Sequence, residues 1–269
     1  NSFHPARRLL AYSLKRTSGL TVLMTVIALL ACPVYTLLKI ERIYENTAKA
    51  YNLNSVAPLL MMITAIASVA AALVYMFINF AFLYSRSSSD FFHSLPTTRT
   101  GLLFARLISS VLPIIIPVTL VYGAMCGLKF SKYVECNIKP ILKGYAFNLL
   151  ILFALAAFSL IFMICAGSIF DLIISFFTFN IGIVLVQLIN SSLCQNFLFG
   201  YPYNYTESIV NASSPYWFAF NRFANILEGV LPARSEIFFA VKLLIITFFS
   251  LAVSIALYRG RKSEKSGIS

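Results

Sequence analysis

The sequence predicts an all-α membrane protein with six transmembrane helices. Of its 269 residues, 59% are hydrophobic and only 11% are charged, whereas a soluble domain carries about 25% charged residues. The apolar residues also gather in long uninterrupted runs rather than in the alternating pattern of strands. Together these observations exclude a soluble globular enzyme, a disordered chain and a disulfide-stabilised scaffold.

Each predicted span is an apolar run long enough to cross a bilayer. A helix needs about 20 apolar residues to cross a hydrocarbon core about 30 Å thick, and lipid-facing backbone must form its hydrogen bonds internally. These requirements define a six-helix transmembrane domain over residues 20–258. The predicted spans are 20–40, 57–84, 105–128, 145–167, 171–190 and 237–258.

Residues 1–19 have two chemically different sides at helical spacing. One side is apolar, and the other is basic and aromatic, which predicts an amphipathic helix lying on an anionic membrane surface. The alternative is a basic flank of the first span. The apolar side is formed by Phe3, Ala6, Leu9, Leu10 and Leu14, and the opposite side by Arg8, Tyr12, Lys15 and Arg16.

Charge distribution sets the predicted orientation. Lys and Arg are divided almost equally between the two sides, so the positive-inside rule alone does not decide. The groups of Lys and Arg near the two termini are dense and contain almost no Asp or Glu, and most acidic residues fall in the loops on the opposite predicted side. We therefore predict a multi-pass protein of the cell membrane with both termini cytoplasmic. Residues 191–236 form an aromatic extracytoplasmic segment with short helices, and 259–269 a cytoplasmic tail that we expect to continue into a longer polypeptide.

The sequence predicts a chain without catalytic, cofactor or metal sites of its own. It contains no GxxxxGK[ST], HExxH or GxSxG motif, and its five cysteines lack metal-binding spacing. Cys136 and Cys194 fall in loops on the same predicted side, which leaves a disulfide open. The net charge of +12 comes from short basic groups flanking the spans, not from a nucleic-acid-binding patch.

Ionisable side chains are absent from the centres of the predicted spans. Ion-driven transporters usually carry such groups there, so any uphill transport would draw its energy from a partner. Three amides on the fifth predicted span share one arc: Asn180, Gln187 and Asn190. They either hydrogen-bond to neighbouring helices, which we favour, or line a wet translocation path.

A cytoplasmic loop at 85–104 predicts a short capped helix. Ser89 or Asp90 can cap its start, Pro96 ends it, and Thr97 or Thr98 can cap the next helix. Its apolar side chains cannot be buried by so short a helix alone. The helix therefore either docks into a groove of another protein or anchors at the membrane interface.

Two segments resemble a known family. "SRSSSDFFHSLPTTRTGLLFARL" (85–107) resembles the first cytoplasmic loop of six-span, exporter-like permease subunits in bacterial ATP-binding-cassette transporters, a loop that reads roughly sD-x-x-x-SLP-x-(S/T)R. "YRGRKSEKSG" (258–267) resembles the ending that follows the sixth span in Gram-positive members.

The resemblance implies a cytoplasmic coupling helix that sits on a separate nucleotide-binding ATPase subunit, which would hold the ATP and Mg. It further implies a membrane-surface helix at 3–17, a second contact at 166–171, membrane lipids and a second permease subunit, identical or different. The substrate would be a peptide, lipid or amphipathic drug that is exported or extracted. The alternative is a membrane sensor or immunity protein that binds an antimicrobial peptide without pumping it. The implied coupling residues are Asp90, Phe91, Phe92, His93, Ser94, Leu95, Pro96, Thr98 and Arg99.

Overall fold

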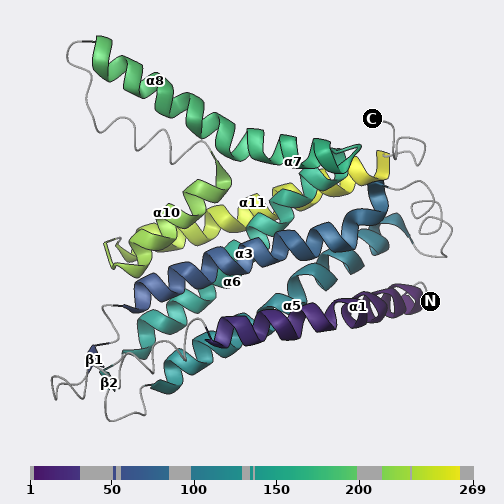
Figure 1. The fold of residues 1–269 in the computed structure, drawn as a ribbon, viewed down its shortest axis with the longest axis horizontal. Coiled ribbons are helices and arrows are strands. Elements are labelled where there is room, and N and C mark those ends of the chain that lie inside the picture. Colours follow the sequence, from purple (N-terminus) through teal and green to yellow (C-terminus); the bar gives the residue numbers. More distant parts are fainter. Residues whose placement is uncertain are drawn as a thin grey trace.

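The computed structural model shows a bundle of long helices (Figure 1). It describes residues 3–30, 51–52, 56–84, 98–128, 134–135, 137–198, 214–230 and 232–260. A two-residue parallel pair, β1 (Tyr51–Asn52) with β2 (Val134–Glu135), lies at one end. The helices are α1 (Phe3–Leu29), α3 (Ala57–Phe80), η3 (Ala81–Tyr84), α5 (Arg99–Gly127), α6 (Ile138–Cys165), α7 (Ile169–Phe177), the π-helix η5 (Thr178–Gly182), α8 (Ile183–Phe197), α10 (Pro215–Leu227) and α11 (Ala233–Gly260).

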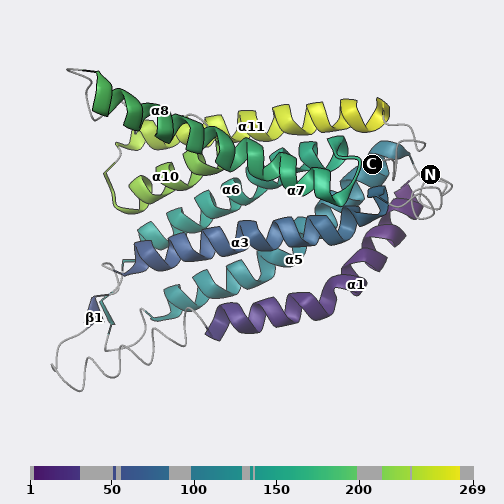
Figure 2. The same ribbon diagram turned by 45° about the horizontal axis from the view of Figure 1, so that its top comes forward.

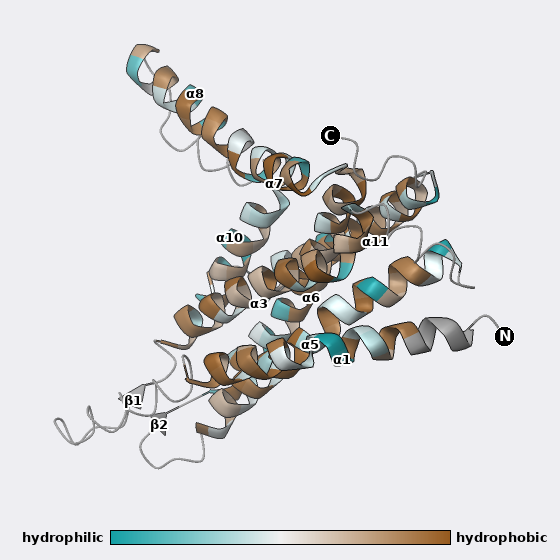
Figure 3. Cartoon of the chain, turned by 45° about the vertical axis from the view of Figure 1, so that its right-hand side comes forward, coloured by the Kyte–Doolittle hydropathy of each residue, from teal (hydrophilic) through white to brown (hydrophobic). Residues whose placement is uncertain are grey.

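Five helical stretches of the described chain are long and apolar enough to cross a membrane. They overlap the second to sixth predicted spans, although the stretches over the third and fourth spans end at Gly127 and Cys165, short of the predicted ends at 128 and 167. Apolar residues cover most of their length in Figure 3. The predicted all-helical, multi-pass membrane class is therefore confirmed at this level. The stretches are Ala57–Tyr84, Arg99–Gly127, Ile138–Cys165, Ile169–Cys194 and Ala233–Gly260.

The N-terminal region differs from the two segments that the sequence predicts. Helix α1 runs without a break from Phe3 to Leu29, across the predicted boundary between residues 19 and 20, whereas residues 31–40 lie outside the described residues. Threonine hydroxyls along this stretch find their hydrogen-bond acceptors within the helix itself. Thr17, Thr21 and Thr25 each donate to the carbonyl four residues earlier, at 3.0, 3.0 and 2.7 Å.

Helices α3, α5 and α6 form the centre of the bundle, as Figure 2 shows. Helix α3 contributes a face of small residues to this centre, since Ala65, Ser68 and Ala72 are all buried. Helix α5 remains helical through Pro113 and Pro117, because neighbouring groups in a membrane bundle can satisfy the carbonyls that a proline frees. Helix α6 lies between α3 and α11 and packs against both.

Tight packing occurs at Gly144, which lies outside the glycine pair spaced like a packing motif in this chain. Gly123 and Gly127 have the spacing of a close-packing motif, but a Cβ added at either would meet no heavy atom within 4 Å. At Gly144 of α6, an added Cβ would collide with Met61 Sδ and lie 3.2 Å from Leu227 Cδ2. Gly144 is therefore a position where side chains of α3 and α10 pack closely against the backbone of α6.

The α7–η5–α8 arm diverges from the bundle (Figures 1 and 3). Its side chains are largely exposed, including Val186 at 67% and Phe197 at 81%. The chain then returns to the bundle through α10, which buries Ala219, Phe223 and Ile226. This confirms a short helix within the predicted 191–236 segment.

Replacing Gly144 with leucine should destabilise the protein by about 1–3 kcal/mol, the usual cost of overfilling a packed core. The added atoms would displace Met61 and Leu227. Thermal unfolding in detergent would measure the loss, with Gly127→Leu as the matched control because its surroundings are open. The double variant Gly144→Leu/Met61→Ala should recover part of the stability. Equal melting temperatures for Gly144→Leu and Gly127→Leu would contradict the close approach.

Candidate functional site

One end of the bundle brings together the helix ends that flank the predicted coupling loop. Helix α1 begins and α11 ends at this terminal end of the bundle (Figure 1), where η3 ends and α5 begins on either side of the loop. Of the predicted coupling residues, Thr98 and Arg99 are described. The others lie outside the described residues: Asp90, Phe91, Phe92, His93, Ser94, Leu95 and Pro96.

Thr98 caps α5, which confirms one of the two caps that the sequence predicts. Its backbone is extended (φ −69°, ψ 144°), and its hydroxyl oxygen accepts a hydrogen bond from Gly101 N at 3.2 Å. A Cβ at residue 101 would lie 2.9 Å from that oxygen, so glycine leaves room for the cap. The cap fixes where the chain leaves the loop and becomes helical.

Arg99 joins the start of α5 to the end of α11. Its Nη1 donates to the backbone carbonyl of Arg259 at 3.1 Å, 160 residues away in the sequence. The last carbonyls of a helix have no intrahelical donor and carry partial negative charge, so a guanidinium there is favourable. The contact brings together the two segments on which the family resemblance rests.

Arg106 lies two turns farther along α5 than Arg99. The sequence analysis did not predict it as a site residue and treated it as one of the basic residues that flank the spans. Its side chain is 1% exposed, and its guanidinium carbon lies 5.3 Å from the centroid of the Phe82 ring. Arg16 and Tyr258 are electrostatic neighbours from α1 and α11. One sequence feature could have indicated its burial. Ser109 and Ser110 follow Arg106 by three and four residues, so the three side chains form a polar face on an otherwise apolar helix.

Buried hydrogen bonds extend this polar region toward α1 and α3. Asn79 Nδ2 donates to Ser110 Oγ at 3.0 Å, and the Tyr75 hydroxyl donates to Thr21 Oγ1 at 3.0 Å. Asn79 and Ser110 are almost completely buried. These bonds fix α3 against α5 and α1 close to the loop.

The predicted second contact at 166–171 is a well-formed helix start at the terminal end. Ser168 Oγ accepts from Asp171 N at 3.2 Å, and Asp171 Oδ2 accepts from Ser168 N at 3.1 Å. This reciprocal pair is a capping box. It turns the chain sharply from α6 into α7.

The three amides predicted on the fifth span do not converge on one site. Asn180 Nδ2 donates to Phe176 O, and its Oδ1 accepts from Ser214 Oγ, both at 2.9 Å, so it bonds to the cap of α10. Asn190 is exposed, with Cys194 Sγ at 3.9 Å. Gln187 is half-buried, and its Oε1 has no hydrogen-bond partner among the described residues. For Asn180, the interhelical hydrogen bond is the interpretation that the structure supports.

An aromatic cluster holds α10 against α6 and η5. Phe158 and Phe162 of α6 pack against Phe179 with ring centroids 5.7 and 5.4 Å apart, and Phe176 lies 5.4 Å from Tyr216. The Tyr216 hydroxyl donates to Leu155 O at 3.2 Å. Burial raises the pKa of the Tyr216 phenol, and this shift is partly offset by a hydrogen bond with Ser159, so Tyr216 stays neutral at physiological pH.

No protein-family model, curated protein or solved structure matches this chain. Within the part of the chain that the structure describes, no three His, Cys, Asp or Glu side chains lie close enough to hold a metal ion. The candidate site is the terminal end of the bundle, where the Thr98 cap, the Arg99–Arg259 contact and the buried Arg106 are found.

Replacing Thr98 with valine should loosen the first turn of α5. Loss of a helix cap costs about 1 kcal/mol, so the amide hydrogens of residues 99–102 should exchange about fivefold faster. Hydrogen–deuterium exchange with peptide mass spectrometry would measure this, and Thr98→Ser, which retains the hydroxyl, should exchange like the wild type. An unchanged exchange rate in the valine variant would show that the cap is dispensable.

Proposed function

We propose that this chain is the membrane-spanning permease subunit of an ATP-driven transporter. It would export or extract a peptide, lipid or amphipathic drug, with ATP and Mg held by a separate ATPase subunit. The observation that carries the proposal is the Arg99–Arg259 contact, because it ties the exit of the predicted coupling loop to the end of α11.

Both flanks of the loop are attached to the bundle. On the entry side, the hydroxyl of Tyr84, the last residue of η3, donates to Met163 O of α6 at 3.0 Å. On the exit side, Thr98 caps α5 and Arg99 contacts α11. A force that a partner ATPase applies to the loop would therefore act directly on the ends of α5, α6 and α11.

Charge at the two ends supports the proposed orientation in the cell membrane, with both termini cytoplasmic. Lys15 and Arg16 are exposed on α1, at the end that also carries Arg99 and Arg259. The opposite end carries basic residues as well, among them Lys139 and Lys143. The proposed orientation therefore rests on the dense groups of Lys and Arg near the two termini, which are typical of cytoplasmic segments.

The proposal includes a second permease subunit, identical or different, and surrounding lipid. The long apolar surfaces of α8 and α11, with Val186 and Phe249 at 67 and 68% exposure, are suited to lipid or to another membrane helix. The chain itself would be non-catalytic, since the ATPase subunit would bind and hydrolyse the nucleotide.

The variants Leu95→Asp and Arg99→Glu should remain in the membrane and lose coupling to the ATPase. Leu95→Asp would replace an apolar contact of the proposed interface with a charge, and Arg99→Glu would remove the bond to the Arg259 carbonyl. Association with the ATPase that copurifies with the wild type should therefore weaken at least about tenfold. Reconstituted vesicles would be used to measure substrate-stimulated ATP hydrolysis. Lys139→Glu is the matched control, because it reverses an exposed positive charge at the opposite end of the bundle.

Full stimulated hydrolysis in Leu95→Asp and Arg99→Glu would refute the loop assignment. If no ATPase copurifies with the wild type, the transporter proposal fails as a whole. Binding of an antimicrobial peptide without stimulated hydrolysis would favour the sensor or immunity protein instead.

A further inference from the structure

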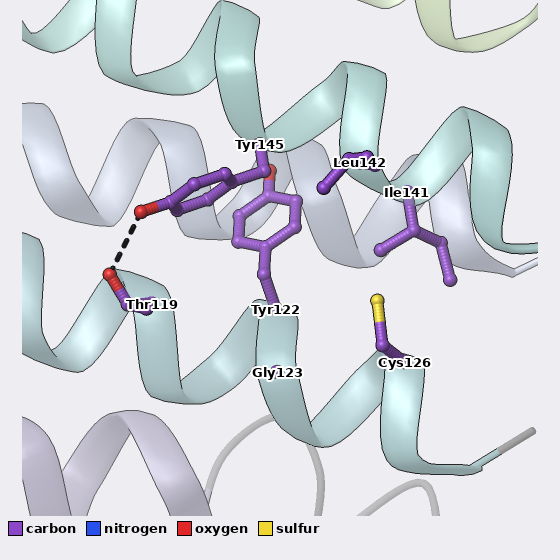
Figure 4. A pocket seen from close by; sticks show the side chains of 7 residues that line it. All are labelled: Thr119, Tyr122, Gly123, Cys126, Ile141, Leu142 and Tyr145. Atoms are coloured by element: carbon purple, nitrogen blue, oxygen red, sulfur yellow. Dashed lines mark hydrogen bonds between the residues drawn. The ribbon is translucent and has the colours of Figure 1, made fainter. Parts of the chain in front are cut away.

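Helices α5 and α6 enclose a pocket of about 170 Å³ at the end of the bundle opposite the coupling loop (Figure 4). It lies within two to three turns of the end of α5 and of the start of α6. The rings of Tyr122 and Tyr145 form one wall, with centroids 5.4 Å apart. The lining residues are Thr119, Tyr122, Gly123, Cys126, Ile141, Leu142 and Tyr145.

The polar atoms of the pocket already have partners in the protein. A hydrogen bond of 3.0 Å joins the Tyr145 and Thr119 hydroxyls, and Asn148 Nδ2 donates to the Tyr122 hydroxyl oxygen at 3.4 Å. No Lys, Arg, Asp, Glu or His lines the pocket. A ligand could therefore contact only the two tyrosine rings, the aliphatic side chains and the Cys126 thiol. This lining favours an apolar ligand.

The pocket opens toward the surface that lipid would cover. Leu142 is 63% exposed at its rim, and Ile116 and Leu120, farther back on α5, are 51 and 46% exposed. An apolar group can therefore enter sideways from the bilayer. The size is adequate, since an apolar cavity of about 150 Å³ is known to hold one benzene molecule.

We propose that this pocket binds the alkyl chain or single aromatic ring of a membrane-dissolved amphiphile. The occupant lies against the ring of Tyr122, whose hydroxyl is hydrogen-bonded to the buried Asn148 of α6. The site stands on the pocket alone and does not depend on the proposed transport function.

Photolabelling of the full chain in vesicles tests the site. One probe is a long-chain alcohol that carries an alkyl diazirine, and the other is a phosphatidylcholine with the diazirine in an acyl chain. Peptide mass spectrometry should find saturable labelling within residues 119–126 and 141–145, reduced by excess unlabelled alcohol. Labelling by the alcohol alone identifies a free amphiphile as occupant, labelling by the phospholipid alone identifies a lipid chain, and either result supports the site.

Gly123→Leu should lower this labelling at least about tenfold, because a larger side chain at the pocket competes with the ligand for the same space. Its added Cβ meets no heavy atom within 4 Å, so the fold should tolerate it, and gel filtration would verify this. Gly127→Leu is the matched control, since Gly127 is equally open but does not line the pocket. Tyr145→Phe, which retains the ring, should label normally.

Unsaturable labelling spread along α5 and α6 and unchanged in Gly123→Leu would overturn the proposal, because it would report only the surrounding lipid. Loss of labelling in both glycine variants, with both still folded, would equally refute a pocket-specific site.

Discussion

A polar side chain inside a membrane bundle must find its hydrogen-bond partner within the protein, and Asn148 shows how this requirement organises the fold. Its amide is completely buried. It donates to the Tyr122 hydroxyl of α5 at 3.4 Å and accepts from the Ser68 hydroxyl of α3 at 3.1 Å. Such bonds average about 0.6 kcal/mol in membranes, so they contribute less to strength than to selecting one register of α3, α5 and α6.

A second layer of buried contacts links α3 and η3 to α5 nearer the terminal end. Asn79 of α3 bonds to Ser110 of α5, and the Arg106 guanidinium of α5 lies over the Phe82 ring of η3. Two anchoring layers at different depths hold α3 and α5 side by side. The Tyr122 pocket adjoins the first layer, and the ends of η3 and α5 that flank the predicted coupling loop adjoin the second, so the two layers lie toward opposite ends of the bundle.

The sequence predicted features that depend on local chemistry. Long apolar runs define the later spans, and Thr98 caps α5 because a threonine before a helical run can accept from the first turn. Contacts between helices could not be predicted from the sequence. Gly123 and Gly127 have the spacing of a close-packing motif, but a Cβ added at either meets no heavy atom within 4 Å, whereas one added at Gly144 meets the side chains of Met61 and Leu227. The burial of Arg106 depends in the same way on the side chains that other helices bring to it. The coupling residues 90–96 stay predictions.

The region around η5 extends the chain of contacts beyond the core. A π-turn places one extra residue in the helix and is often found at functional positions, and here Asn180 within it bonds to Ser214 at the start of α10. Helix α10 is in turn held to α6 by the Tyr216–Leu155 bond. Because α11 packs along α6 and its end is bound by Arg99, a displacement of the loop that moves α11 must be accommodated by α6. Besides α3 and α5, the elements that pack against α6 include α10 and η5, where the α7–α8 arm leaves the bundle.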